Sequence, residues 1–148
     1  MTTRPSPTPS AAEVLDRSSV RDAMSLGLFH CAADDEIAVV ARTMAEKAIH
    51  CVIVAGIVSR DRAGEHLSWG IVSDMDLMRA LAPGGEGTTA AEVAGTEILT
   101  VSPRESLQSA VQLMTEHETA HLVVVSPDTG RPVGMLSTLD VARVVDAA

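Results

Sequence analysis

An internal repeat constrains the fold of this chain more than any other feature, because a repeated pattern implies a repeated structural unit. Residues 20–55 align without a gap on residues 90–125, at an offset of 70 positions. Identities are few, but the apolar positions coincide almost throughout, and Met44 falls on Met114. The chain therefore carries two copies of one supersecondary unit.

The later part of the repeat shows where the two copies differ. Beyond residue 55 the offset falls to 64, so that Gly70 matches Gly134 and Asp76 matches Asp140. The first copy thus holds six additional residues, which lie in the polar and charged segment SRDRAGEHLS. Insertions of this kind are tolerated at the tip of a hairpin. We expect a longer hairpin in the first copy.

Each copy predicts the same order of elements: a short strand, a helix, a strand, a hairpin turn, a strand and a helix. In the second copy, Ser102, Pro103 and Glu105 predict an N-cap, a first-turn proline and the glutamate of a capping box. Apolar residues recur at helical spacing in both copies. They are Ile37, Val40, Ala41 and Met44 in the first copy and Leu107, Ala110, Val111 and Met114 in the second.

The predicted fold class is α/β (α+β), with two pseudo-symmetric β-α-β-β-α modules. We expect a disordered leader over residues 1–12, a first module over 13–82, a glycine-rich linker over 83–90 and a second module over 91–148. Neither copy is large enough to bury a sufficient core alone, so the modules are expected to pack sheet to sheet. A cleft between them is then the natural ligand site.

Composition excludes several classes of function. A formal net charge of −9 opposes nucleic acid binding, and Phe29 and Trp69 are the only aromatic residues available to stack on bases. The longest apolar runs are far shorter than the roughly 20 residues of a membrane span, and the N-terminus lacks a secretory signal. We therefore expect no nucleic acid partner, no membrane, and a cytoplasmic location in which Cys31 and Cys51 stay free thiols.

The strongest motif is Gly-h-h-Ser-x-x-Asp, in which h is an apolar residue. It occurs as GIVSDMD from Gly70 to Asp76 and as GMLSTLD from Gly134 to Asp140. The serine predicts a helix N-cap, and the aspartate complements the helix dipole. The glycine lets another group approach the backbone closely at a helix start, where a phosphate fits, and the aspartate suits a ribose diol.

This duplicated arrangement resembles the CBS-domain family from about Val20 to Val145. The resemblance implies a stand-alone tandem CBS pair that regulates and is not an enzyme. Such a pair requires no cofactor and senses AMP, ADP, ATP or S-adenosylmethionine-type ligands, signalling by a conformational shift. A homodimer is implied as well. Because no effector domain is attached, we expect either action in trans on an unidentified protein partner or use as a cellular ligand sensor.

The resemblance also implies two clefts, each shared by the aspartate of one module and a strand start of the other. In these clefts Asp76 and Asp140 bind ribose, while Ser73 and Ser137 face the phosphate. The adenine walls expected beside Asp140 and Ser137 are Met24, Phe29, Ile49, His50 and Cys51. The walls expected beside Asp76 and Ser73 are Ala94, Leu99, Thr119, Ala120 and His121.

The chain departs from the family pattern beside each aspartate. Many phosphate-binding members carry a basic residue just before it, whereas this chain has Met75 and Leu139. We therefore expect a ligand with little phosphate charge, such as AMP, adenosine or S-adenosylmethionine, ahead of ATP. Arg79 and Arg143 follow the aspartates by three positions, a helical spacing more typical of a solvated or ion-paired face than of a ligand contact.

Two other functions stay open. A structural or oligomerisation module without a physiological ligand has the same repeat. A small enzyme is disfavoured, because the chain has no nucleophile elbow, metalloprotease motif or P-loop. Asp76 and Asp140 also stand in equivalent positions, whereas an acid and a base need two different environments.

Two adjacent His-Cys pairs, His30-Cys31 and His50-Cys51, raise the question of zinc. Consecutive strand residues point to opposite faces of a sheet, so neither pair can hold one ion without a bend. We therefore expect no metal. His50 either lines a cleft or is a partly exposed structural histidine.

Overall fold

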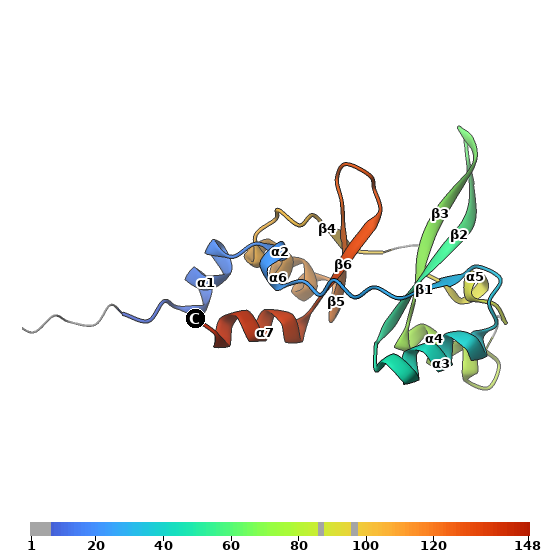
Figure 1. Cartoon of the computed structure of the whole chain (residues 1–148), viewed down its shortest axis with the longest axis horizontal. Helices are drawn as coiled ribbons and strands as arrows, with labels where there is room; N and C mark the ends of the chain where they lie inside the picture. Colours follow the sequence, from blue (N-terminus) through green and yellow to red (C-terminus); the bar gives the residue numbers. More distant parts are fainter. Residues whose placement is uncertain (1–6, 86–87, 96–97) are drawn as a thin grey trace, which may run out of the picture. The chain divides into compact units, whose positions relative to one another are not determined.

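The computed structural model describes residues 7–85, 88–95 and 98–148, which fold into two compact units (Figure 1). The continuous unit is Leu28–Ile98. The discontinuous unit joins Met1–Gly27 to Leu99–Ala148. Each unit has its own three-stranded sheet and its own apolar core.

The continuous unit has strand order β1-β2-β3, with β1 parallel to β2 and β2 antiparallel to β3. Its elements are β1 (His30–Ala32), α3 (Ile37–Lys47), β2 (Cys51–Asp61), β3 (Gly64–Ser73), α4 (Asp74–Leu81) and α5 (Ala90–Val93). The predicted insertion forms the far end of the long twisted β2–β3 hairpin (Figure 1). A longer hairpin in the first copy is therefore confirmed.

The discontinuous unit has strand order β4-β5-β6 with the same parallel and antiparallel pairings. Its elements are α1 (Ala11–Arg17), α2 (Val20–Ala23), β4 (Thr100–Val101), α6 (Leu107–Glu116), β5 (His121–Val125), β6 (Pro132–Ser137) and α7 (Thr138–Asp146). The predicted α/β class and the predicted order of elements are confirmed in both copies. Packing of one module's sheet on the other stays a prediction.

Five of the eight residues that the helical periodicity predicted to be buried lie in the two cores: Val40, Met44, Leu107, Ala110 and Met114. In the continuous unit, Val40 and Met44 of α3 pack against the buried strand residues Val52, Val54 and Val72. The other unit repeats this layer with apolar side chains from α2, α6 and all three strands. Its buried residues are Val20, Val101, Leu107, Ala110, Met114, Leu122, Val124 and Leu136.

The start of each copy folds onto the body of the other copy. In the discontinuous unit, the Val20 amide donates to the Glu105 carbonyl at 2.8 Å. In the continuous unit, the Ala90 amide donates to the Asp35 carbonyl, also at 2.8 Å. These bonds are equivalent at the 70-residue offset. The predicted boundaries at 82 and 91 thus mark the repeat in the sequence, whereas the compact units change at residues 27 and 98.

One predicted helix start needs correction. Helix α6 begins at Leu107 with Ser106 as its N-cap, so the predicted N-cap at Ser102 is wrong by about one turn. The Glu105 carboxylate does accept from the Ser102 amide at 3.2 Å. The Glu105 amide, however, donates to the Ser102 carbonyl at 3.1 Å, and this bond closes a turn. The reciprocal contact therefore belongs to a turn that precedes the helix.

The ends of the predicted modules differ slightly from the elements observed. Helix α1 begins at Ala11 behind the N-cap Ser10, so the last two residues of the predicted 1–12 leader are helical. Residues 1–6 of that leader and residues 86–87 of the predicted linker lie outside the described residues. Helix α5 begins at Ala90, the last residue of the predicted linker. Across the described ranges, no helix combines the length and apolarity required to cross a bilayer.

Candidate functional site

The Gly-h-h-Ser-x-x-Asp motif forms the turn from a strand into a helix in each copy. We call these turns the first corner (Gly70–Asp76, between β3 and α4) and the second corner (Gly134–Asp140, between β6 and α7). Each serine caps its helix, since its hydroxyl accepts from the aspartate amide at 3.1 Å in the first corner and 3.2 Å in the second. The predicted N-caps are therefore confirmed.

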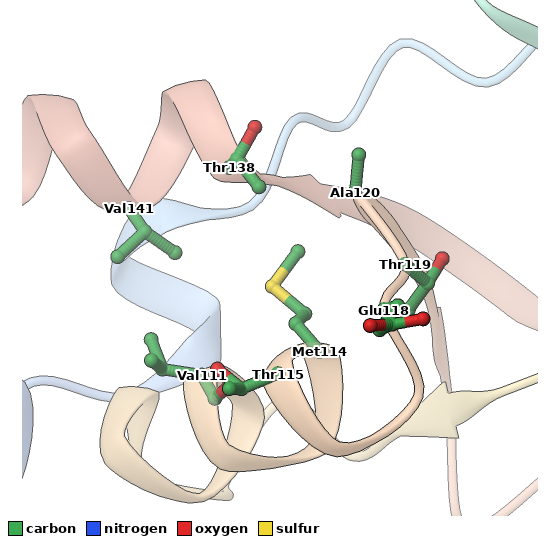
Figure 2. A pocket seen from close by; sticks show the side chains of 8 residues that line it. All are labelled: Val111, Met114, Thr115, Glu118, Thr119, Ala120, Thr138 and Val141. Carbon is green, nitrogen blue, oxygen red and sulfur yellow. The ribbon is translucent and has the colours of Figure 1, made fainter.

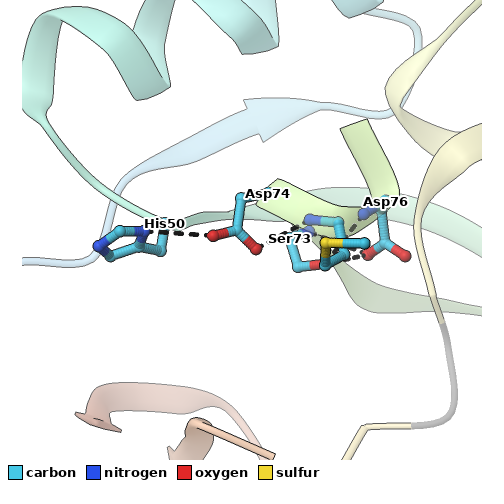
Figure 3. Close-up of polar contacts among 5 residues, drawn as sticks. His50, Ser73, Asp74 and Asp76 are labelled. Carbon is cyan, nitrogen blue, oxygen red and sulfur yellow. Dashed lines mark hydrogen bonds and ion pairs between the residues drawn. The ribbon is translucent and has the colours of Figure 1, made fainter. Parts of the chain in front are cut away.

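The capping box occupies one oxygen of each aspartate. Asp76 Oδ2 accepts from the Ser73 amide and hydroxyl, each at 2.9 Å (Figure 3). Asp140 Oδ2 accepts from the Ser137 amide at 2.9 Å and hydroxyl at 3.0 Å. Each serine hydroxyl is thus both donor and acceptor within its box, and one lone pair remains on it. Only Oδ1 of each aspartate is left to meet other groups.

The corner glycines also have a structural explanation within the chain, and a ligand beside them stays a prediction. Ser25 pairs with Met135 through bonds of 2.8 and 3.0 Å and crosses the strand at Gly134. A Cβ on Gly134 would lie 2.9 Å from the Ser25 carbonyl oxygen. Gly70 is approached likewise by the Gly95 carbonyl, at 3.2 Å. At Gly134 the nearest group is thus the backbone of a crossing segment of the chain, whereas a Cβ on Gly70 would come closest to Ile57 Cδ1, at 2.7 Å.

The remaining oxygens of the two aspartates have different surroundings. Asp140 Oδ1 accepts from the Ser25 hydroxyl at 3.2 Å, and its side chain is 7% exposed. Asp76 is 21% exposed, and its Oδ1 has an ion pair with Arg79 at 3.5 Å. Arg143 is 3.9 Å from Asp140 Oδ1. Both arginine side chains are well exposed, which confirms the prediction of a solvated or ion-paired face.

A second carboxylate stands in the first corner. Asp74, the first residue of α4, accepts from the Met75 amide at 2.8 Å and lies 3.2 Å from His50 Nδ1 (Figure 3). Its amide donates to the His50 carbonyl at 2.8 Å. The second corner has Thr138 in the equivalent place, so it holds one carboxylate fewer. His50 is exposed beside the first corner, on the same unit.

The predicted adenine walls divide between the two units. Met24 belongs to the same unit as Asp140, and Ala94 belongs to the same unit as Asp76. The others fall in the unit that does not hold their predicted aspartate, so their grouping with it stays a prediction. They are Phe29, Ile49, His50 and Cys51 in the continuous unit and Leu99, Thr119, Ala120 and His121 in the discontinuous unit.

Within its own unit, each predicted wall residue has a clear position. Cys51 pairs with Ser73 in the β2–β3 ladder, and His121 pairs with Ser137 in the β5–β6 ladder. Both therefore start a strand beside the serine of their own copy. The other wall residues are partly buried against a core or exposed at its edge: Met24 and Leu99 pack on one core, Ile49 and Ala94 on the other, and Lys47 Nζ lies 5.4 Å from the centre of the Phe29 ring.

Thr119 and Ala120 line a pocket of about 400 Å³ in the discontinuous unit (Figure 2). The pocket lies among α6, the turn after it and the first residues of α7, and neither Ser137 nor Asp140 contributes to its wall. At the equivalent places the continuous unit carries the bulkier Ile49, His50 and Leu77 in place of Thr119, Ala120 and Val141, but the smaller Ala41, Ala45 and Ala48 in place of Val111, Thr115 and Glu118. The lining residues are Val111, Met114, Thr115, Glu118, Thr119, Ala120, Thr138 and Val141.

Sequence reasoning missed two residues at the corners. Ser25 was overlooked because nothing local marks it, although the repeat alignment does place it opposite Gly95. Asp74 was overlooked because the motif leaves its position unspecified. Both differ between the copies, and comparison of the copies position by position is the signal that finds them.

We expect the thiol of Cys51 to react only at high pH. Burial, with a smaller contribution from the Asp74 carboxylate, raises the pKa of Cys51 from 9.0 to about 11. The thiolate is the nucleophile, so in a Cys31→Ser background the rate of alkylation by iodoacetamide should keep rising with pH up to about 11. Asp74→Asn should shift that rise to lower pH, while Asp128→Asn in an exposed turn should not. A rate that levels off near pH 9 contradicts this assignment.

Metal binding has no support from the geometry of the described side chains. Over residues 7–85, 88–95 and 98–148, no group of three or more His, Cys, Asp or Glu residues is arranged to hold an ion.

The fold and the corners define a protein of two α/β repeat modules, each with a capped, aspartate-bearing helix start. The family model described as CBS domain matches residues 20–83 and 90–147, and the chain belongs to this family.

One curated relative resembles part of the chain in sequence. The CBS domain-containing protein YhcV of Bacillus subtilis (strain 168) is 36% identical over 75 residues, which are 49% of this chain and 52% of YhcV. The chain thus spans about half the length of this curated relative.

Two solved structures share the fold over most of the chain. The CBS domain pair of protein MJ0100, in complex with 5′-methylthioadenosine and S-adenosyl-L-methionine, has a TM-score of 0.70 and 21% identity, covering 86% of this chain and 98% of that one. CBSX2 in complex with AMP has a TM-score of 0.72 and 21% identity, covering 88% and 97%.

Proposed function

We propose that this protein is a regulatory module that binds an adenosine ligand carrying little phosphate charge, such as adenosine, AMP or S-adenosylmethionine. The observation that supports this most is the first corner, where a partly exposed aspartate stands at a helix start with one oxygen outside the capping box. Adenosine ligands in two related folds, MJ0100 and CBSX2, give the ligand class.

The chemistry of Asp76 fits a ribose. Its Oδ2 accepts from the serine amide and hydroxyl, whereas Oδ1 lies 3.5 Å from the exposed guanidinium of Arg79. A carboxylate oxygen accepts two hydrogen bonds, and hydrogen bonds to an ionised acceptor are stronger than neutral ones. The two hydroxyls of a ribose are both donors. Asp76 Oδ1 therefore suits a vicinal diol and gives no favourable contact to a phosphate.

The charge around the first corner sets the order of ligands. Met75 and Leu139, at the positions where many family members carry a cation, are exposed apolar residues. Asp74 adds a second carboxylate beside Asp76, and the whole chain has a net charge of −9. Like charges at close range repel, so a triphosphate is disfavoured while the positive sulfonium of S-adenosylmethionine is favoured.

Signalling by such a module requires two conformations with different affinities for the ligand. In this proposal the ligand bridges the two modules, and the conformation it stabilises is recognised by a protein partner in trans. The module acts in the cytoplasm as a homodimer and performs no chemistry of its own.

Calorimetry and thermal shift with adenosine, AMP, S-adenosylmethionine and ATP test this proposal. We expect the first three to bind more tightly than ATP, and a ligand at a hundred times its dissociation constant to stabilise the fold by about 2.7 kcal/mol. Asp76→Asn keeps the shape of the side chain but removes its charge, and should weaken binding at least about tenfold, as loss of a charge-assisted bond does. Asp128→Asn is the matched control and should bind as the unmodified protein does.

Three results would contradict the proposal. Tighter binding of ATP than of AMP would overturn the order of ligands. Absence of a shift with every compound would favour a structural or oligomerisation module. Unchanged affinity in the Asp76→Asn variant would remove the first corner from the site.

A further inference from the structure

We propose that the two corners have separate tasks. Asp76 is the aspartate that binds the ligand. The carboxylate of Asp140 is instead covered by the Ser25 hydroxyl, and it links the Ser25 segment to the start of α7. The protein then binds one adenosine ligand per chain through an aspartate, despite its two copies. This inference rests on the proposed function and adds to it which corner is occupied.

Asp140 already has partners at both of its oxygens. Oδ2 accepts from the Ser137 amide and hydroxyl, and Oδ1 accepts from the Ser25 hydroxyl at 3.2 Å. Its side chain is only 7% exposed. A ribose that sought this carboxylate would have to displace the Ser25 hydroxyl from a nearly buried site. A buried polar group that loses its partner is costly, so this exchange opposes binding.

Ser25 is held in place to make this contact. Its amide donates to the Met135 carbonyl at 2.8 Å, and its carbonyl accepts from the Met135 amide at 3.0 Å. A residue bonded on both sides to a strand cannot move away without breaking that pairing. The hydroxyl therefore stays over Asp140 unless its side chain rotates.

The first corner has the same crossing segment without the hydroxyl. Gly95 stands opposite Ser25 in the repeat and pairs with Ile71 through bonds of 3.0 and 3.3 Å. The backbone arrangement is thus preserved, while the group that would cover Asp76 is absent from that residue. Among the described contacts, Asp76 Oδ1 has the ion pair with Arg79, whose side chain is 73% exposed. A solvated arginine can move aside at little cost.

Two single substitutions reverse this difference between the copies, since one removes the hydroxyl at Asp140 and the other adds a hydroxyl at Asp76. Ser25→Ala removes the hydroxyl from Asp140 and keeps the crossing strand. Gly95→Ser introduces a hydroxyl beside Asp76, and it fits, because among the described residues a Cβ on Gly95 meets only the Ile71 carbonyl oxygen, at 4.0 Å. The backbone of Gly95 is also outside the left-handed region that disfavours serine. Thermal unfolding and circular dichroism of both variants verify that the fold is retained.

Isothermal titration with S-adenosylmethionine and with AMP tests the proposal. We expect one site per chain in the unmodified protein, two in Ser25→Ala, and at least about tenfold weaker binding in Gly95→Ser, the effect of one charge-assisted hydrogen bond. In the double variant the site should move to the second corner, so that adding Asp76→Asn no longer weakens it. Two equal sites in the unmodified protein, or stoichiometry and affinity that neither substitution alters, would overturn the inequality of the corners. Absence of binding in every variant would overturn the proposed function itself, and this inference with it.

Discussion

Replacing Leu107 by alanine is expected to lower the free energy of unfolding by about 2 to 5 kcal/mol, the range found for leucine truncation in packed cores. Leu107 is the first residue of α6 and is fully buried in the core of the discontinuous unit. Its amide also donates to the Ser18 carbonyl at 2.9 Å, so the side chain lies where α6 meets the segment from the N-terminus. A cavity there cannot be filled by a small local movement.

Urea denaturation followed by circular dichroism measures this loss. Leu139→Ala in the same unit is the matched control, since the Leu139 side chain is 56% exposed, and it should change the stability by less than about 0.5 kcal/mol. Equal effects of the two substitutions would contradict the position of Leu107 in the core.

Replacing Gly134 by alanine is expected to destabilise the protein by about 1 to 3 kcal/mol, the range typical of an overpacked site. The new Cβ would lie 2.9 Å from the Ser25 carbonyl oxygen and 3.0 Å from Met24 Sδ. The methionine can rotate, but the carbonyl belongs to backbone that is bonded to Met135 and can move only by breaking that pairing. The loss of stability in Gly134→Ala therefore measures how closely the Ser25 backbone approaches the backbone of Gly134.

Gly27→Ala is the control for this substitution. A Cβ on Gly27 meets nothing within 4 Å, so the variant should unfold at nearly the same urea concentration as the unmodified protein. A Gly134→Ala variant as stable as the Gly27→Ala variant would contradict the close crossing. It would also favour the prediction that the corner glycine makes room for a ligand.

Much of the fold follows from patterns that are local in the sequence. Apolar spacing predicts α3 and α6, alternating turn and strand composition predicts both hairpins, and the 64-residue offset locates the insertion at the β2–β3 tip. The serine caps of α4 and α7 were predictable for the same reason, since a cap and its partner are three residues apart. The start of α6 was predicted too early because a serine and a glutamate at that spacing also stabilise a turn.

What the tertiary structure alone decided involves residues that are distant in the chain. The amide of Val20 finds its acceptor in Glu105, and the hydroxyl of Ser25 meets Asp140, 115 positions further along. No periodicity links such residues, because their contact depends on where whole elements pack. The sequence by itself therefore determined the repeat, the elements and the aspartates, whereas folding decided which segment crosses each glycine and which aspartate stays accessible.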